Sequence, residues 1–285
     1  RECPRPAASP SFSANHQKRI MNSLLFVELF KILKRPRSYI GIVLITAIVI
    51  LIEAAMYVDG KNYVNFILTQ LETTFSIEGK VLSGNLVCYI ILQTLIIQMP
   101  LLVALVTGDM ISGEAASGTL RYILTRPASR AKLLLAKFIA GNIYVLILLL
   151  CLGLLALGGG LLLFGDGDLI VLKSDEIFIL REGDILWRFF AAFGIAFLSL
   201  GVVAAFSMML SCFTDNSIGP IVSSMAVIIL FTIIGSLELP VFDAIKPFPF
   251  TTHMIVWRNM FDQPLQMDVI LTSCIILLAH IFLFL

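Results

Sequence analysis

Charged residues are scarce in this 285-residue sequence. Asp, Glu, Lys and Arg make up 14% of it, whereas hydrophobic residues make up 59%. A soluble domain is typically about a quarter charged and about half apolar, so this composition excludes an ordinary soluble domain. We therefore predict a polytopic integral membrane protein. The net charge of +1 does not indicate a nucleic-acid partner, and we expect none.

Cysteine and histidine are also few, which limits the metal and redox chemistry open to the chain. The cysteines are Cys3, Cys88, Cys151, Cys212 and Cys274. No two form a C-x-x-C pair, and four lie within or at the ends of apolar runs, which predicts buried apolar residues rather than disulfides or zinc ligands. The histidines are His16, His253 and His280. They form no H-E-x-x-H arrangement, and we expect no metal site, no cofactor bound by this chain and no catalytic residue.

Six apolar runs are long enough to cross the hydrocarbon core of a bilayer, which needs about 20 helical residues. We place the spans at about 40–58, 86–107, 133–164, 185–212, 218–237 and 268–285. The predicted fold class is an all-α integral membrane protein. Residues 21–285 form its transmembrane domain.

The region before the first span divides into a tail and a helix. Residues 1–20 are polar and lack periodicity, so we expect a non-native or disordered tail with Met21 as the natural start. Asn22 to Arg35 has apolar residues at helical spacing, and Pro36 ends the pattern. This segment predicts an N-terminal amphipathic helix in the membrane interface, with its lysines toward anionic headgroups, or else the polar start of the first span. At the other end, we expect the chain to be truncated within the sixth span.

Two connections and two intramembrane residues stand out. Residues 165–184 are acidic but fit no EF-hand spacing, which predicts a solvated loop. Residues 238–267 alternate aromatics with prolines, which predicts broken or re-entrant helices at the interface. Glu53 is a functional candidate as an intramembrane carboxylate, unless it pairs inside the bundle or reaches the interface. The role of His280 stays open.

Lysines and arginines concentrate on one predicted side of the membrane. The clustered residues are Lys31, Lys34, Arg35, Arg37, Arg121, Arg126, Arg130, Lys132 and Lys137. The connections on the other side are net acidic. The positive-inside rule then predicts a multi-pass plasma-membrane protein, in bacteria an inner-membrane protein, with both termini in the cytoplasm.

The longest polar interruption between two apolar runs is Gly108 to Lys137. Asp109 is placed to cap a new helix after the second span ends at Gly108, and Gly118 permits a bend. Glu114 and Arg121 are expected on the polar faces of this helix.

The second half of the interruption leads the chain back into the membrane at the start of the third span. A residue before proline disfavours helical geometry, so Pro127 breaks the helix, and Ser129 can cap the third span. Lys132 and Lys137 are expected to keep their charges at the headgroups. The G-x-x-x-x-G spacing within this stretch is not a phosphate-binding loop, because Thr119 stands where the lysine is required.

The pattern GD-x-x-x-GE-x-x-x-GTLR-x-x-L-x-RP-x-SR resembles the type-2 ABC transporter permeases, especially the bacterial six-span branch. The matching residues are Gly108, Asp109, Gly113, Glu114, Gly118, Thr119, Leu120, Arg121, Arg126, Pro127, Ser129 and Arg130. The resemblance extends over residues 21–285. It implies that two permease chains form a homodimer or heterodimer that catalyses no reaction itself. ATP is then bound by two separate ATPase subunits. It also implies that Asp109 to Thr125 is a cytoplasmic coupling helix that docks into the ATPase, with the matching residues from Asp109 to Arg130 as the ATPase-coupling set.

Other functions remain open at this point. The polar stretch is also compatible with an ordinary loop, and the chain with a secondary, ion-coupled transporter or an integral-membrane lipid-modifying enzyme. A transporter of that kind would need several intramembrane charges, and Glu53 is nearly alone. The transported substrate, and whether the direction is export or import, do not follow from the residues, although export is our expectation.

Overall fold

The computed structural model describes residues 10–69, 82–124, 129–172, 177–237 and 239–285. Six of its helices are long and apolar enough to cross a membrane, which makes the chain a multi-pass membrane protein. The spans are Pro36–Val64, Gly84–Ala116, Arg130–Phe164, Gly183–Ser211, Ile218–Ser236 and Met267–Phe284. The prediction of six spans is confirmed, although the first four are longer than expected.

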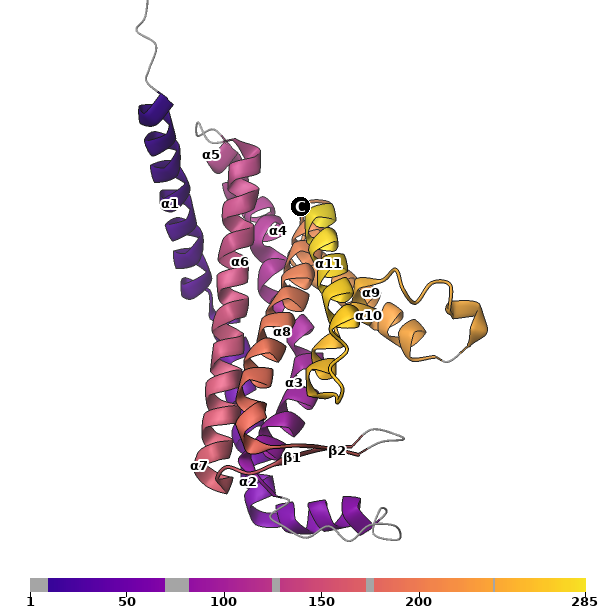
Figure 1. Cartoon of the computed structure of the whole chain (residues 1–285). Coiled ribbons are helices and arrows are strands. Elements are labelled where there is room, and N and C mark those ends of the chain that lie inside the picture. Colours follow the sequence, from indigo (N-terminus) through magenta and orange to yellow (C-terminus); the bar gives the residue numbers. More distant parts are fainter. Residues whose placement is uncertain (1–9, 70–81, 125–128, 173–176, 238) are drawn as a thin grey trace, which may run out of the picture.

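The elements follow one another as a series of helices with one small sheet (Figure 1). The first half holds α1 (Pro10–Lys34), α2 (Pro36–Thr69), α3 (Gly84–Thr107), α4 (Asp109–Ala116), α5 (Thr119–Leu124) and α6 (Arg130–Gly153). A π-helix η1 (Leu154–Gly159) and α7 (Gly160–Phe164) continue α6 without a break, and β1 (Leu169–Leu172) and β2 (Ile177–Leu180) follow. The second half holds α8 (Glu182–Ser211), α9 (Ile218–Ser236), η2 (Pro240–Phe242), α10 (Phe250–His253), η3 (Val256–Phe261) and α11 (Met267–Phe284).

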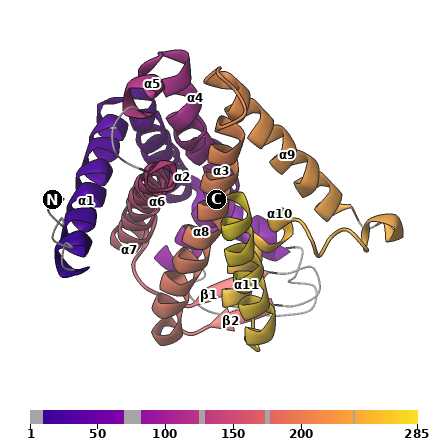
Figure 2. The ribbon, with the colours of Figure 1, turned by 90° about the horizontal axis from the view of Figure 1, so that it is seen from above.

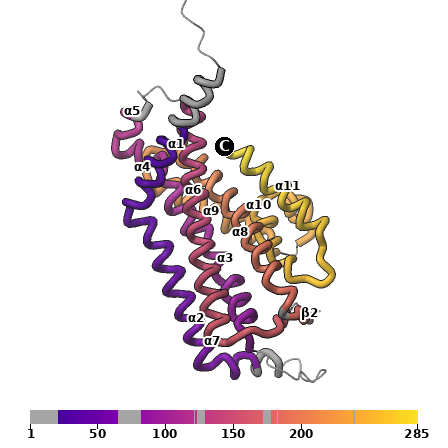
Figure 3. The backbone as a smooth tube through the Cα atoms, turned by 60° about the vertical axis from the view of Figure 1, so that its left-hand side comes forward, coloured from indigo at the N-terminus to yellow at the C-terminus, as the bar shows by residue number. Residues whose placement is uncertain are grey.

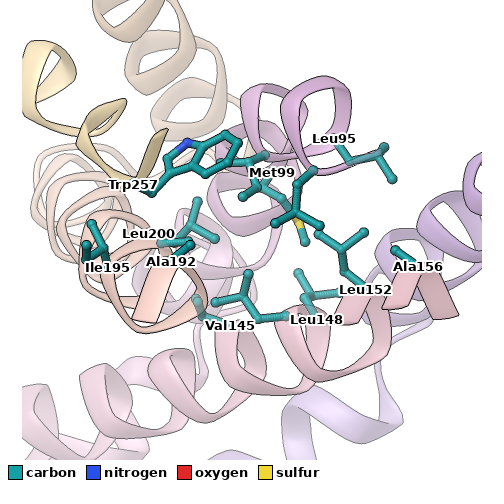
Figure 4. Close-up of a cluster of buried hydrophobic side chains, with 14 of the residues drawn as sticks. Leu95, Met99, Val145, Leu148, Leu152, Ala156, Ala192, Ile195, Leu200 and Trp257 are labelled. Atoms are coloured by element: carbon teal, nitrogen blue, oxygen red, sulfur yellow. The ribbon is translucent and has the colours of Figure 1, made fainter. Parts of the chain in front are cut away.

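Helix α8 lies at the centre of the bundle and contacts α3, α6, α9 and α11. Figure 4 shows how side chains from three helices and from η3 meet there, including Met99 of α3, Leu148 of α6, Ala192 of α8 and Trp257 of η3. All four are buried. Helices α9 and α11 expose most of their surface and lie at the periphery, with α9 splayed away from the rest in Figure 2.

The bundle has two distinct ends. One carries the junction of α1 and α2 together with α4, α5 and the start of α6, and we call it the α4 end (Figure 1). The other carries α7 and the β-hairpin, and we call it the hairpin end. Pro36 begins α2 directly after α1, as expected from the lack of a backbone N–H in proline.

The acidic connection is not a plain loop, and this expectation was wrong. Strands β1 and β2 pair antiparallel, with Leu169 opposite Leu180 and Ile170 opposite Ile179. Leu169 and Leu180 are fully buried, and Ile170 and Val171 are buried as well, whereas Ile179 is exposed. The apolar side chains of β1 therefore pack into the protein instead of facing water. The fold is therefore helical with one added β-hairpin.

Two further expectations are corrected by burial. The segment before α11 does form short broken helices, but Trp257 and Phe261 are buried against Tyr89 and Phe189 rather than placed as interfacial anchors. Cys212 is exposed rather than buried. In addition, α1 begins at Pro10, within the segment that we expected to be a disordered tail.

Candidate functional site

The second span continues into the predicted coupling segment without a break in helical backbone. Gly108 has φ −65° and ψ −25°, and its N–H donates to the carbonyl of Ala104. Helix α4 is thus an extension of α3. Asp109 is the first residue of α4, after Gly108 at the N-cap position, and its side chain pairs with arginines instead of a backbone N–H. The prediction that Asp109 caps a new helix was therefore wrong, because the helical backbone of α3 continues through Gly108.

Asp109 instead joins α4 to the start of α2. Its Oδ2 accepts a hydrogen bond of 2.7 Å from Arg35, and its Oδ1 forms an ion pair of 3.1 Å with Arg37. A Cβ atom added to Gly113 would overlap the Asp109 carboxylate. Gly113 therefore lets this side chain fold back over its own helix, which explains why the pattern needs a glycine four residues after the aspartate.

Four charged side chains, three of them buried, meet one turn further along α4. We call Glu28, Lys31, Glu114 and Lys137 the charge quartet. Lys31 Nζ lies 2.8 Å from Glu28 Oε1 and 2.8 Å from Glu114 Oε1. Lys137 Nζ lies 2.9 Å from Glu28 Oε2 and 2.9 Å from Glu114 Oε1. The quartet is neutral overall, and it binds α1, α4 and α6 together.

The members of the quartet are buried to different extents. The Lys137 side chain is 2% exposed and each glutamate side chain 4%, whereas that of Lys31 is 32% exposed. Burial disfavours the charge on Lys31, but hydrogen bonds from it to Glu114 and Glu28 outweigh that effect, so the pKa of Lys31 is raised above its usual value of 10.5. Removing one partner of such a buried set leaves an uncompensated charge, which costs about 3–5 kcal/mol.

The quartet does not enclose a ligand site. A cavity of about 10 Å³ lies beside Lys31 and Glu114, close to the lower limit for one water molecule. Within the ranges described, no three His, Cys, Asp or Glu side chains are grouped as metal ligands. The arrangement fastens helices together rather than holding a substrate.

Helix α8 supports α4 from the inner side. Ser211 Oγ accepts hydrogen bonds from the backbone N–H of Ser112, at 2.8 Å, and of Ile111, at 3.3 Å. One helical turn earlier, Thr107 and Ser207 share a hydrogen bond of 2.5 Å between their hydroxyls. A displacement of α4 would therefore be transmitted to the central helix of the bundle.

Beyond the quartet, the chain forms an exposed turn between α4 and α5. Gly118 has φ +72°, a conformation that favours glycine, and Ala116, Ser117 and Thr119 are exposed around it. We call residues 116–119 the α4 tip. Thr119 Oγ1 lies within hydrogen-bond distance of the Ser117 hydroxyl and the Glu114 carbonyl, at 2.9 and 3.3 Å, so the tip has a defined shape. The bend predicted at Gly118 is confirmed.

The remaining residues of the predicted set lie around this turn. Leu120 is half-buried and Arg130 is exposed. Ser129 caps α6 by accepting a hydrogen bond of 3.4 Å from the backbone N–H of Lys132, as predicted. Arg126 and Pro127 lie outside the described residues, and so does the side chain of Arg121.

Two lysines do not reach the headgroups as expected. Lys137 is buried in the quartet, and Lys31 points toward Glu28 and Glu114 while Phe26 and Phe30 of the same helix are exposed. The polar face of α1 therefore turns inward. Glu28 was missed at the sequence level, although a lysine such as Lys137 inside an apolar run requires a carboxylate partner, and that requirement was the available signal.

The comparison with protein families assigns most of the chain to a family. A family model described as a protein of unknown function (DUF2705) matches residues 44–285, which is most of the chain. The chain belongs to the DUF2705 family. No curated protein matches the sequence.

The residues matched by the DUF2705 model include only part of the charged site. Asp109, Glu114 and Lys137 lie within the matched residues, whereas Glu28 and Lys31 of α1 precede them. The DUF2705 region therefore supplies one glutamate and one lysine of the quartet, and the helix in front of it supplies the other pair.

Proposed function

We propose that this chain is the membrane-spanning subunit of an ATP-binding cassette transporter. A separate ATPase chain binds ATP and docks on the α4 tip, and the permease acts as a homodimer or heterodimer in the plasma membrane. The α4 end and both termini then lie in the cytoplasm, and the transport direction is export. The resemblance of Gly108–Arg130 to the type-2 permeases is the starting point for this proposal.

The observation that carries the proposal is an exposed tip on a rigid, anchored helix. The tip ends a helical segment of 33 residues, Gly84–Ala116, which is the second span. The quartet and Asp109 fasten its last two turns to α1, α2 and α6, and Ser211 fastens them to α8. A partner that pushes on residues 116–119 would therefore move several spans together, which is what mechanical coupling requires.

The buried site supports a division of the coupling residues into two roles. Asp109, Gly113 and Glu114 are positioning residues, since their side chains or their Cα positions are taken up by contacts inside the chain. Gly118 and Thr119 of the tip, with Leu120 beside it, are the residues proposed to contact the ATPase. Basic residues at the same end, including Arg35, Arg37 and Arg130, support a cytoplasmic location.

The test is co-purification of this chain with an ATPase subunit, and any ATPase encoded by a neighbouring gene is the first candidate. Thr119→Lys places a positive charge on the tip. Asn62→Lys adds the same charge at an exposed residue of α2, away from the α4 end. We expect Thr119→Lys to weaken ATPase binding by about tenfold or more, equivalent to about 1.4 kcal/mol, and Asn62→Lys to leave it unchanged. ATP hydrolysis by the complex should fall in parallel.

Two results would contradict the proposal. One is that no ATPase associates with the wild-type chain, and the other is that both lysine variants bind it equally well. Glu114→Arg is not a suitable docking variant, because this side chain is buried and its replacement would disrupt the quartet whatever binds outside.

A further inference from the structure

Glu53 is a third buried glutamate, in the first span and away from the quartet. It is 8% exposed, and its Oε1 atom is buried without a hydrogen-bond partner. Within the ranges described, no lysine, arginine or histidine forms an ion pair with it. The expectation that it pairs inside the bundle is therefore not met.

The surroundings of Glu53 are shaped to receive the carboxyl group. Helix α2 runs beside η1 and α7 (Figure 3), and a Cβ atom added to Gly159 of η1 would overlap both carboxyl oxygens. The neighbouring Gly158 has open space around it. Gly159 is thus the residue whose missing side chain makes room for Glu53.

The backbone at this point is unusual and held in place. Residues Leu154–Gly159 form a π-helix, and single π-turns inside α-helices are frequent at functional sites. Directly after it, Gly160 approaches the backbone of Gly84 so closely that a Cβ atom would lie 2.9 Å from the Gly84 carbonyl oxygen. Helix α3 therefore limits how far η1 can move away from α2.

The charge state of Glu53 follows from what faces it. An ionised carboxylate in hydrocarbon without a counter-ion is very costly, and such a group takes up a proton or a cation instead. Helix α3 contributes Cys88, whose fully buried thiol supplies no positive charge to offset a carboxylate. The part of η1 beside Glu53 contributes glycines. In the described part of the chain, α1, α6 and α7 contribute no ion-pair partner to it.

We propose that Glu53 is a proton-binding site within the membrane, and that its neutral carboxyl group packs against Gly159. Loss of the proton would place an unpaired charge against the π-helix and loosen the contact between α2 and η1. This inference does not rest on the proposed transporter function, since it uses neither the α4 tip nor an ATPase.

The test is labelling of the full chain in detergent with dicyclohexylcarbodiimide, an apolar reagent for protonated carboxyl groups. The carboxyl proton moves to a carbodiimide nitrogen while the carboxylate oxygen bonds to the central carbon, so the reagent adds as a whole and no group leaves. We expect mass spectrometry of peptides to find the label on Glu53, to find less of it as the pH is raised, and to find none in Glu53→Gln. A water-soluble carbodiimide should label exposed carboxylates and not Glu53.

A pair of glycine variants tests the geometry. Gly159→Ala displaces the carboxyl group and should reduce labelling of Glu53, whereas Gly158→Ala adds the same methyl group in open space and should leave it unchanged. Thermal unfolding of each variant shows whether it is folded, and Glu53→Gln is isosteric, so it supplies a folded reference. Absence of label on Glu53, label that does not depend on pH, or equal labelling in both alanine variants would each overturn the proposal.

Discussion

Glu114 and Glu53 are both buried glutamates in spans of one bundle, yet their surroundings are opposite. Glu114 is 3% exposed and lies 2.8 Å from Lys31 and 2.9 Å from Lys137. Glu53 is 8% exposed, and its carboxyl group lies against Gly159 instead of against a lysine or arginine. One carboxylate is part of a neutral set that joins three helices, while the other can remain in hydrocarbon only when a proton neutralises it. The same residue type thus fastens one end of the bundle and makes the other end responsive to protons.

The largest expected effect comes from removing the most buried cation. Lys137→Met leaves Glu28 and Glu114 with Lys31 as their single cation, and it should destabilise the folded chain by about 3–5 kcal/mol. Thermal unfolding in detergent, followed by circular dichroism, measures the loss. Adding Glu28→Gln to Lys137→Met restores neutrality and should recover part of the stability. Equal stability of Lys137→Met and the wild type would mean that the quartet is not the fastening described here.

A smaller effect is expected when the Glu114 carboxylate of the quartet is neutralised. Glu114→Gln keeps the shape and an acceptor oxygen but loses the charge, and a hydrogen bond to a charged group contributes about 1.5–3 kcal/mol. We expect a loss of about 2 kcal/mol, measured in the same unfolding experiment. The matched variant is Glu114→Asp, which keeps the charge and shortens the reach. If neutral and charged variants unfold alike, packing rather than charge holds α4.

Lys31 should contribute less than Lys137 because water reaches it. Lys31→Met should cost about 1 kcal/mol, in the range of partly exposed ion pairs. Since the pKa of Lys31 is raised in the folded chain, its contribution is present below the ordinary value of 10.5 and is lost as the pH rises through the raised value. An unfolding series at alkaline pH should therefore bring the wild type and Lys31→Met together, and a constant difference between them would contradict this role.

The smallest effect is expected at Glu53. Glu53→Gln replaces a neutral carboxyl group by a neutral amide of the same shape, so the change in unfolding free energy should be below about 0.5 kcal/mol near neutral pH. The comparison with Glu114→Gln is made in one unfolding experiment under the same conditions. A large destabilisation by Glu53→Gln would show that the carboxylate at position 53 is ionised and paired.

The two sites differ in how far they could be predicted. Glu53 was recognisable as a candidate because a carboxylate stands alone in an apolar run, and Gly158 to Gly160 were visible as a glycine cluster in another run. Their contact was not predictable, since positions 53 and 159 are joined only by the packing of α2 on η1. In the coupling segment, the bend at Gly118 and the cap at Ser129 follow from local backbone preferences, and both were predicted correctly. Asp109 pairs with Arg35 and Arg37. Lys137 pairs with Glu28 and Glu114. All four partners are distant along the chain, and the sequence alone assigned both side chains wrongly.

The sequence by itself determined the class of protein, the six spans, the bend at Gly118 and the helix cap at Ser129, because those depend on hydropathy and on conformational preferences of neighbouring residues. It also marked the polar stretch after the second span as distinctive. Only the tertiary structure decided that α4 extends α3, that the charged face of α1 turns inward, and that Glu114 is paired while Glu53 is not. These outcomes depend on which helices lie side by side, since the energy of a buried charge is set by neighbours that are distant along the chain.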